Sequence, residues 1–476
     1  MEKRVIVLGA GAAGLTAAIA SAQGGVETVV LEKAPDLQNT NTARSGGAIS
    51  IAMEWERDPK RPRLTVEEKV REAMDASDGR CDPALVRAWA ENIDATVAWM
   101  KESGMKWGKP IGPGIPPELG VFALGGGAGL NKQLLSVAEK NGCKVLFNVR
   151  GEKLLTDSQG GVTGVRTRTP RGMEDFAAGS VVLATSGFQA NQEMLLKYFG
   201  PKVGPRFAYE VRLTGSPFST GDGHIMAQEV GAKLVGMDQC HGRNIDSSWV
   251  PGSPCLLGPY RVLQYPLVHY AIWLNKKGRR FMDEGICSDT AANAILVQPE
   301  SEVAYLFDEG IKALRPRLVE EFRPPEVLIK ANTLGEIAQR IGVPPDQLRN
   351  TVDEYNKAID EGKADRLDAP KRAFTKKIEN PPFYAVYPVW FGLNCTLGGP
   401  HINPQAQVQD RDDIPIPGLF AAGEMIGGFY SGKYYTTEGG ASYYRGNYQV
   451  TCTALSMCVV FGRIAGISAA RWCKGT

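Results

Sequence analysis

The sequence predicts an α/β protein with a parallel sheet and a second domain. Residues 4–33 read as a short β-branched strand, a glycine-rich turn, an alanine-rich helix and another short strand. Strands that alternate with helices in this order form parallel βαβ units. At 476 residues the chain is also too long for a single hydrophobic core, so we expect at least two domains.

The turn after the first strand carries three glycines at a characteristic spacing, Gly9, Gly11 and Gly14. The first allows a tight turn, the second lets backbone amides approach a diphosphate, and the third lets the helix pack closely on the strand. The N-terminus of the helix then faces the phosphates with its partial positive charge. This pattern predicts a Rossmann-type dinucleotide site. Ala12 and Ala13, between the second and third glycines, belong to the same site, where the turn leads into the helix.

The second strand, residues 28–31, ends at Glu32. A carboxylate at this position accepts hydrogen bonds from ribose hydroxyls. It would repel a 2′-phosphate, which argues against NADP.

Two amphipathic helices are expected after this first unit. One is opened by Thr65 as N-cap, and the other by Asp82 as N-cap with Pro83 at its first position. In the second helix, apolar residues recur at helical spacing, which predicts a packing stripe. The stripe consists of Leu85, Trp89, Ile93, Thr96 and Met100.

Farther along, a glycine-rich turn at 125–129 leads into another helix and the strand KVLFNV. Residues 152–187 read as strand, Gly-Gly turn, strand and strand. The stretch 360–372, DEGKADRLDAPKR, is expected to be a solvated surface loop.

Composition excludes several functions. With 54 basic and 52 acidic residues, the chain has no cationic excess for nucleic acid. Nine cysteines without a Cys-x-x-Cys pair, and four histidines without ligand spacing, predict neither disulfides nor a metal site. No signal peptide is apparent, which suggests the cytoplasm. The apolar stretch 453–470 contains Arg463 and several glycines, so we expect a buried helix and not a membrane span.

Four segments resemble one flavoprotein family. They are residues 43–47 (ARSGG), 181–191 (VVLATSGFQAN), 219–234 (STGDGHIMAQEVGAKL) and 416–428 (IPGLFAAGEMIGG). They are similar to the fumarate reductase and succinate dehydrogenase flavoprotein superfamily, which also includes 3-ketosteroid dehydrogenases. The resemblance is weak between about 240 and 390, where substrates are chosen in this family.

The resemblance implies a Rossmann-type FAD-binding domain, residues 1–239 and 391–476, with an inserted α+β substrate-capping domain, residues 240–390. Family members that bind FAD covalently carry a histidine six residues before the double glycine, where this chain has Thr40, so the FAD should be non-covalent. Ser186 replaces the first glycine of an Ala-Thr-Gly-Gly motif, a change that a small side chain should tolerate. The FAD-binding residues implied are Gly9, Gly11, Ala12, Ala13, Gly14, Glu32, Lys33, Arg44, Ser45, Gly46, Gly47, Val149, Ala184, Thr185, Ser186, Gly187, Asp222, Gly423, Glu424, Ala454 and Leu455.

The residues for a dicarboxylate substrate are largely missing. By the resemblance, fumarate-reducing members hold their substrate with histidines and arginines, and an arginine delivers the proton. His241 falls at a substrate-binding histidine, but Ser288 stands in place of the proton-donating arginine. Asn394 and Cys395 replace a second histidine. His241 could equally be a core histidine held by hydrogen bonds.

A tail with six tyrosines between residues 430 and 448 offers other chemistry. Counted without gaps from the FGR sequence, Tyr448 and Cys452 fall on the Tyr-x-x-x-Gly pair that binds the carbonyl in 3-ketosteroid dehydrogenases, and Tyr435 with Gly439 has the same spacing. Removing hydrogen next to a ketone needs a donor at the carbonyl oxygen and a base for the α-proton. Tyrosine suits both roles, with Arg445 as a candidate cation, although tyrosines in such a loop can also serve packing alone.

We therefore expect an FAD-dependent oxidoreductase acting on CH–CH groups, which desaturates a cyclic ketone such as a 3-oxosteroid or an oxocyclohexanecarboxylate. Arg445 or His241 would suit the carboxylate of the latter. An external acceptor, such as oxygen, a quinone or a redox protein, would take the electrons. Two alternatives stay open: an enoate reductase of the fumarate or urocanate type, and an electron-transferring subunit of a larger complex.

Overall fold

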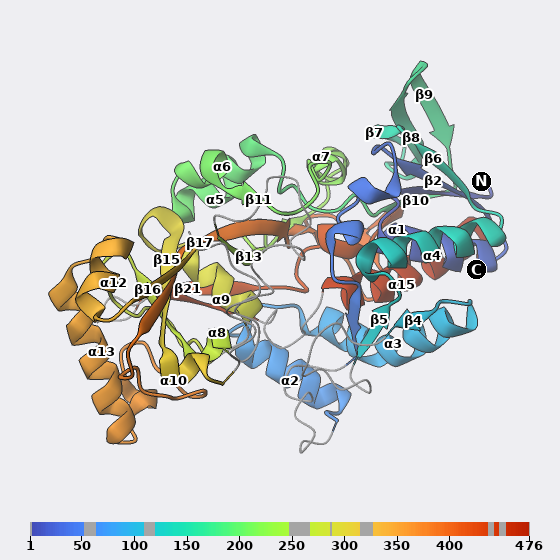
Figure 1. Cartoon of the computed structure of the whole chain (residues 1–476). Coiled ribbons are helices and arrows are strands. Elements are labelled where there is room, and N and C mark those ends of the chain that lie inside the picture. The colour runs from blue at the N-terminus through green and yellow to red at the C-terminus, as the bar shows by residue number, and fades with distance from the viewer. Residues whose placement is uncertain are drawn as a thin grey trace.

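The computed structural model describes residues 2–51, 63–108, 120–246, 267–285, 288–314, 327–436, 442–446 and 454–475. Two bodies stand side by side in Figure 1. One, on the right, holds both chain ends and a mainly parallel sheet covered by helices; the other, on the left, is built on a second sheet flanked by shorter helices.

The first body contains a six-stranded sheet in the order β19-β20-β10-β1-β2-β6. All neighbouring strands are parallel except the edge pair β19 and β20. The central strands are almost completely buried, as expected for a sheet with covered faces. The strands are β1 (Arg4–Leu8), β2 (Glu27–Glu32), β6 (Lys144–Phe147), β10 (Ser180–Leu183), β19 (Gln407–Gln409) and β20 (Pro415–Ala421).

Helices α1 (Ala12–Gln23), α4 (Gly126–Lys140) and α15 (Ala454–Lys474) pack on this sheet. The last helix lies unusually close to the first: a Cβ at Gly466 would come within 2.2 Å of the Ala17 carbonyl oxygen. Of the described helices, α15 alone is long and apolar enough to cross a membrane, and 67% of that window is buried inside the protein. The buried helix expected here is confirmed.

The helical segment after β2 also forms as expected. Helix α2 (Val66–Ala76) begins with a capping box between Thr65 and Glu68, and α3 (Pro83–Glu102) begins with Asp82 as N-cap. The predicted packing stripe of α3 is buried throughout. A small sheet of β3 (Ala48–Ser50), β4 (Trp107–Gly108) and β5 (Gly120–Ala123) lies nearby, together with the short turns η1 (Leu37–Asn39) and η2 (Thr42–Arg44).

A three-stranded antiparallel sheet projects from the first body at the upper right of Figure 1. It consists of β7 (Arg150–Thr156), β8 (Val162–Thr169) and β9 (Gly172–Ala177), with the expected Gly-Gly turn between the first two strands. The following segment contains α5 (Gln192–Val203), α6 (Arg206–Glu210), β11 (Arg212–Leu213), α7 (Asp222–Glu229) and β12 (Leu234–Val235), the last paired with β18 (Gly399–Pro400).

The second body is organised around one long strand, β17 (Phe383–Thr396), which pairs with four others. Its sheet comprises β11, β13 (Cys240–Asp246), β14 (Ile272–Asn275), β15 (Glu302–Asp308) and β16 (Leu328–Ala331). Its helices are α8 (Leu267–Tyr270), α9 (Ser288–Ile295), α10 (Glu309–Lys312), α12 (Leu334–Ile341) and α13 (Pro345–Asp360), with the short turns η6 (Pro299–Ser301) and η7 (Ala364–Arg366).

Each body has its own buried core, as the chain length predicts. The core of the second body also includes Phe188, Phe199 and Phe207, which precede residue 240. The domain limits given above stay a prediction; these phenylalanines place side chains from the 188–208 segment in the second core.

Candidate flavin-binding and active site

The glycine turn between β1 and α1 has the backbone geometry that its glycines imply. Gly9 has φ of +107°, a region that residues with a Cβ rarely adopt. A Cβ at Gly14 would come within 1.9 Å of the Gly9 carbonyl oxygen, so any side chain there would push the helix away from the turn. Gly11 differs, because its φ is −77° and a Cβ would meet only Thr42 Oγ1, at 3.3 Å.

Several residues beside this turn are partly exposed, although the residues around them are buried. They lie beside the carboxyl ends of β1, β2 and β10, where α/β folds bind ligands, and we call this partly exposed region the flavin trough. The residues with this intermediate exposure are Gly9, Gly11, Asn41, Ala43, Arg44, Ser45, Gly46, Thr185, Ser186, Glu424 and Ala454.

Glu32 lies at the end of β2 and is nearly buried. Its Oε2 accepts a hydrogen bond from the Ala10 amide at 2.7 Å, and its Oε1 accepts one from the Ala34 amide at 2.8 Å. Burial raises the pKa of the carboxyl group, while these amides favour its charged form. Each oxygen keeps a second lone pair, so the carboxylate can still accept ribose hydroxyls. The Val149 amide donates to the Glu32 carbonyl oxygen at 2.9 Å, next to this position.

Asp222, the first residue of α7, is held by two cations. Lys33 Nζ lies 2.7 Å from one carboxylate oxygen, and Arg150 NH2 lies 3.0 Å from the other. The pKa of Asp222 is lowered: burial would raise it, but Lys33 and Arg150 outweigh that effect. Lys33 and Asp222, predicted separately, therefore lie together beside the end of β2.

The flavin trough also contains Glu424, in the short turn η8 (Gly423–Met425). Asn41 Nδ2 donates to both of its carboxylate oxygens, at 2.7 and 2.9 Å, and Ser186 Oγ donates at 2.6 Å. The Cys395 thiol also bonds to this carboxylate. Desolvation raises the pKa of Glu424, and these donors partly offset the effect.

Asn41 and Cys395 were not predicted as partners of Glu424. Asn41 lies beside the ARSGG segment, but nothing in the local sequence connects it to a carboxylate 383 positions later. Ser186 has φ of +63°, which the glycine usual at this position would adopt without strain, and its hydroxyl is used for the bond to Glu424.

Thr40, at the position of the covalent attachment histidine, has its hydroxyl engaged locally. It donates to the Leu37 carbonyl oxygen at 2.8 Å and accepts from Asn131 Nδ2 at 2.7 Å. Asn131 also donates to the Ala10 carbonyl oxygen at 3.3 Å, so it ties this loop to the glycine turn. Sequence reasoning missed Asn131, whose role depends on contacts across 91 and 121 positions.

These residues fit FAD. The glycine turn and the start of α1 could offer amides to a diphosphate, Glu32 could offer a carboxylate to the adenosine ribose, and Glu424 is a second carboxylate that could accept ribitol hydroxyls. Ala184, Gly187 and Gly47 are buried behind the flavin trough, and Leu455 lies at the start of α15.

His241 and Cys395 lie on neighbouring strands of the second body, and the Cys395 thiol contacts Glu424 of the first body. The two residues are paired in register between β13 and β17, with a bulge directly after His241, and both are buried. Burial holds the pKa of the Cys395 thiol well above its usual value, so this group is neutral. Helix α9, which begins at Ser288, is anchored to β13 by a 2.9 Å hydrogen bond from Asn293 Nδ2 to the Cys240 carbonyl oxygen.

A tyrosine-bearing hairpin, β21 (Gly432–Thr436) and β22 (Ser442–Gly446), packs against α9 and α2. Tyr435 pairs with Tyr443 across the hairpin, and Lys433 Nζ lies 5.2 Å from the centre of the Tyr435 ring. Arg445 lies in β22, where the structure describes its backbone only, and Tyr448 lies outside the described residues.

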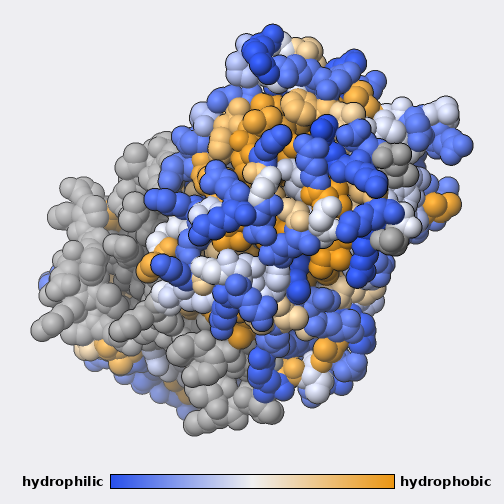
Figure 2. All heavy atoms as spheres, turned by 90° about the vertical axis from the view of Figure 1, so that its right-hand side faces the viewer, coloured by the Kyte–Doolittle hydropathy of each residue, from blue (hydrophilic) through white to orange (hydrophobic). Residues whose placement is uncertain are grey.

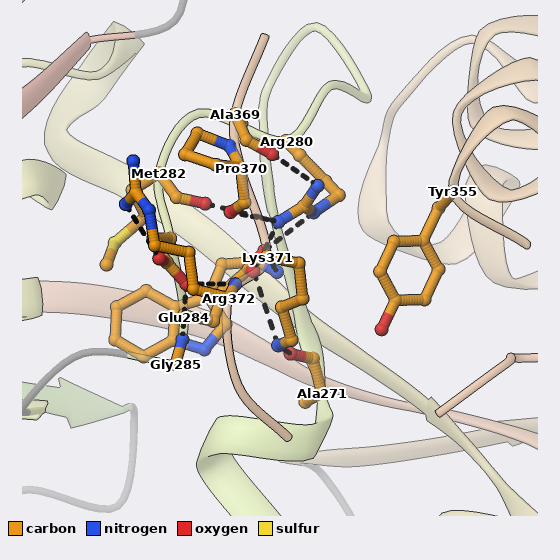
Figure 3. Close-up of polar contacts among 12 residues, drawn as sticks. Ala271, Arg280, Met282, Glu284, Gly285, Tyr355, Ala369, Pro370, Lys371 and Arg372 are labelled. Atoms are coloured by element: carbon orange, nitrogen blue, oxygen red, sulfur yellow. Dashed lines mark hydrogen bonds and ion pairs between the residues drawn. The ribbon is translucent and has the colours of Figure 1, made fainter. Parts of the chain in front are cut away.

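A buried ion cluster supports the second body (Figure 3). Arg280 and Lys371 converge on Glu284 at 2.6 and 3.3 Å, and the side chains of Lys371 and Glu284 have no solvent exposure. Lys371 Nζ also donates to the Ala271 carbonyl oxygen at 3.2 Å. The prediction of a solvated loop for 360–372 is therefore wrong at its end, because the charge pattern did not reveal the buried partner Glu284.

His224, in α7, is completely buried. Its Nε2 lies 2.9 Å from the Gly398 carbonyl oxygen, so it carries the proton and donates. Desolvation lowers the pKa of His224 to about 4, and the imidazole is neutral. No group of three or more potential metal-ligating side chains forms within the described part of the chain, and its six described cysteines are free and buried.

Comparison with known proteins identifies the family of this chain. Residues 4–440 match a family described as "FAD binding domain". A urocanate reductase from Eggerthella lenta is 31% identical, with 98% of this chain and 74% of that protein covered. A fumarate reductase (cytochrome) from Shewanella frigidimarina is 27% identical, with 99% and 77% covered.

Solved structures show the same fold. A flavocytochrome c3 fumarate reductase in its open conformation matches with a TM-score of 0.69 and 28% identity, over 99% of this chain and 78% of that one. A 3-ketosteroid-Δ4-(5α)-dehydrogenase from Rhodococcus jostii matches with a TM-score of 0.74 and 24% identity, over 98% and 96%.

The fold and site thus define an FAD-dependent oxidoreductase, with a Rossmann-type domain and a second α/β body beside it. The chain belongs to the FAD-binding-domain family, in which its relatives include urocanate and fumarate reductases.

Proposed function

We propose that this flavoprotein exchanges a hydride and a proton across a carbon–carbon bond next to a carbonyl, and that its substrate is a cyclic ketone and not a dicarboxylate. The observation that carries the proposal is the tyrosine hairpin β21–β22, which packs against the helix that begins at Ser288. The hairpin thereby lies beside the helix whose first residue stands where the resemblance implies an arginine.

The charge of the site argues against a dicarboxylate. Two carboxylates need fixed cations or strong donors once they leave water, because desolvation is costly for an unpaired charge. Ser288 is uncharged, and Cys395 is a neutral thiol directed to Glu424. His241 remains as a single candidate contact for one anionic or carbonyl group.

FAD, when bound, would supply the hydride acceptor. The protein must hold the ketone, stabilise the negative charge that develops on its oxygen, and remove the α-proton. We assign these roles to tyrosines of the 430–448 segment, Tyr448 first and Tyr435 second, with Arg445 as a cation that favours an ionised phenol and His241 as a second donor. Lys433, 5.2 Å from the Tyr435 ring centre, is a further cation beside that ring.

The FAD-contacting residues are part of the same proposal. The turn residues Gly9 to Gly14 would hold the diphosphate, Glu32 the ribose and Glu424 the ribitol. An external acceptor, such as oxygen, a quinone or a redox protein, would reoxidise the flavin.

One observation favours the reverse direction. The urocanate reductase that is 31% identical over 98% of this chain is named for reduction of a conjugated double bond. The same tyrosine could then donate the α-proton, because forward and reverse reactions pass through the same transition state. An enoate reductase acting on a substrate with one carboxylate is therefore the second candidate.

Anaerobic titrations of the purified holoprotein separate the two. If the protein desaturates ketones, oxidised flavin loses its visible absorbance on addition of a saturated 3-oxosteroid or an oxocyclohexanecarboxylate. If it reduces enoates, dithionite-reduced flavin regains its absorbance on addition of urocanate or acrylate. A protein that responds to neither class, or that is reoxidised rapidly by fumarate, would contradict the proposal.

A further inference from the structure

A second hollow lies away from the flavin trough, between the C-terminal end of α1, the helix α3 and the C-terminal half of α15. Its volume is about 440 Å³, within the range of small-molecule sites. Helix α15 ends near the C-terminus, marked on the right of Figure 1, and Figure 2 looks onto that side, where hydrophobic surface shows between hydrophilic side chains. We call this hollow the α15 groove.

One face of α15 supplies most of the groove. Arg463, Ile467, Arg471 and Lys474 line it, at spacings of four, four and three residues that place them along one side of the helix. Three of these four side chains are cations. The groove is therefore positively charged along about 16 Å of helix, at 1.5 Å per residue.

Helix dipoles explain only part of this charge. Arg471 and Lys474 belong to the last turn of α15, where cations stabilise the exposed carbonyl groups. Arg463 lies eleven residues before the end of the helix, too far for that effect.

Arg463 instead lies over an aromatic ring. Its guanidinium carbon is 5.1 Å from the centre of the Trp99 ring, a cation–π contact that leaves its N–H groups available. Burial lowers the pKa of Arg463, and Glu102 is the carboxylate that acts on it electrostatically. Among the described residues, neither Arg463 nor Lys474 forms a hydrogen bond or an ion pair of 4 Å or less.

The rest of the groove lining consists of apolar side chains and of Trp99, whose ring is held by a hydrogen bond. Ala20, Ile467 and Ala470 form an aliphatic floor, and Trp99 is held in place by a 2.8 Å hydrogen bond from its Nε1 to Gln23 Oε1. A ligand that satisfies both parts carries an anionic group at one end and a compact apolar body at the other.

We propose that the α15 groove binds a small anion of this kind, a phosphate monoester or carboxylate whose oxygens are held by Arg463, Arg471 and Lys474 and whose apolar body rests on Ala20 and Ile467. Arg463 lies about 13 Å along the helix from Ala454, at the edge of the flavin trough, so this site is separate from the catalytic one.

Phenyl phosphate and benzoate are suitable probes, measured by calorimetry on the FAD-loaded protein at constant ionic strength. We expect saturable binding of at least one probe, and weaker binding of inorganic phosphate, which lacks the apolar body. Arg463→Gln and Lys474→Gln should each weaken binding about tenfold, the effect of one lost charged hydrogen bond. Arg411→Gln, at an exposed arginine in the turn between β19 and β20, is the matched control and should change nothing.

Folding is checked by flavin content and melting temperature. If Arg463→Gln fails to fold because Trp99 loses its partner, Lys474→Gln and Ile467→Glu still test the site, and the latter should abolish binding by adding a negative charge to the floor. Absence of saturable binding by the wild type up to about 10 mM, or equal binding by Ile467→Glu, would overturn the proposal.

Discussion

Gly11→Val should remove FAD without unfolding the protein. Gly11 has an ordinary extended conformation, φ −77° and ψ −177°, so a side chain causes no backbone strain. A Cβ there meets a single atom within 4 Å, Thr42 Oγ1 at 3.3 Å, and the rest of the new side chain extends into the trough. The folded apoprotein therefore tolerates valine, but the diphosphate loses its place.

The size of the effect follows from the hydrogen bonds that are lost. If two backbone amides at the start of α1 no longer reach the phosphates, each charged hydrogen bond contributes about 1.5 to 3 kcal/mol, or about 3 to 6 kcal/mol together. That corresponds to about a 100- to 10,000-fold weaker affinity for FAD.

The assay is the flavin-to-protein ratio after gel filtration, followed by fluorescence titration of the apoprotein with FAD. Gly14→Ala is the matched control, because its Cβ would lie 1.9 Å from the Gly9 carbonyl oxygen and must displace α1. We expect that variant to lose both flavin and stability, whereas Gly11→Val keeps the melting temperature of the wild-type apoprotein. A yellow, fully loaded Gly11→Val protein would refute the assignment.

Four further outcomes are expected. Acid precipitation should release free flavin, because Thr40 cannot form the covalent bond; flavin left in the pellet would contradict this. NADH and NADPH should not bleach the flavin in a stopped-flow experiment, since the sequence has one dinucleotide fingerprint. Tyr448→Phe or Tyr435→Phe should reduce turnover about 100- to 1,000-fold with unchanged flavin content; normal flavin reduction by substrate in both would exclude the tyrosines. The folded pKa of His224, about 4, lies below its unfolded value of about 6.5, so the neutral imidazole stabilises the fold above pH 6.5. This contribution to the free energy of unfolding, about 3 kcal/mol, is lost as the pH falls toward 4. Denaturant titrations between these pH values should show the loss, and His224→Gln should make the free energy of unfolding less dependent on pH.

The geometry of the glycine turn and the position of Glu32 at the end of β2 could be predicted because their determinants are local. The glycine turn and Glu32 are close in sequence, and each has a backbone or charge requirement that few other residues meet. Helix caps such as Thr65 and Asp82 are local in the same way, and both form as expected.

The remainder depends on contacts between distant segments. Glu424 was expected in the site, but its partners Asn41 and Cys395 come from segments that only the folded chain brings together. Lys371 lies in a charged stretch typical of surface loops, yet it is buried against Glu284, 87 positions earlier. Charge patterns indicate exposure only when no buried partner of opposite sign exists elsewhere in the chain.

The order of strands in the first sheet also has a consequence for biosynthesis. β10 lies beside β1 but receives its other neighbour, β20, only from residues 415–421, and α1 is covered by α15, residues 454–474. While the ribosome is still making the second body, the emerging N-terminal segment therefore has an unpaired strand edge and an uncovered helix, the features that chaperones protect. Residue 424 is synthesised after residues 415–421 of β20, so we expect the flavin trough to be complete only after both segments have been made.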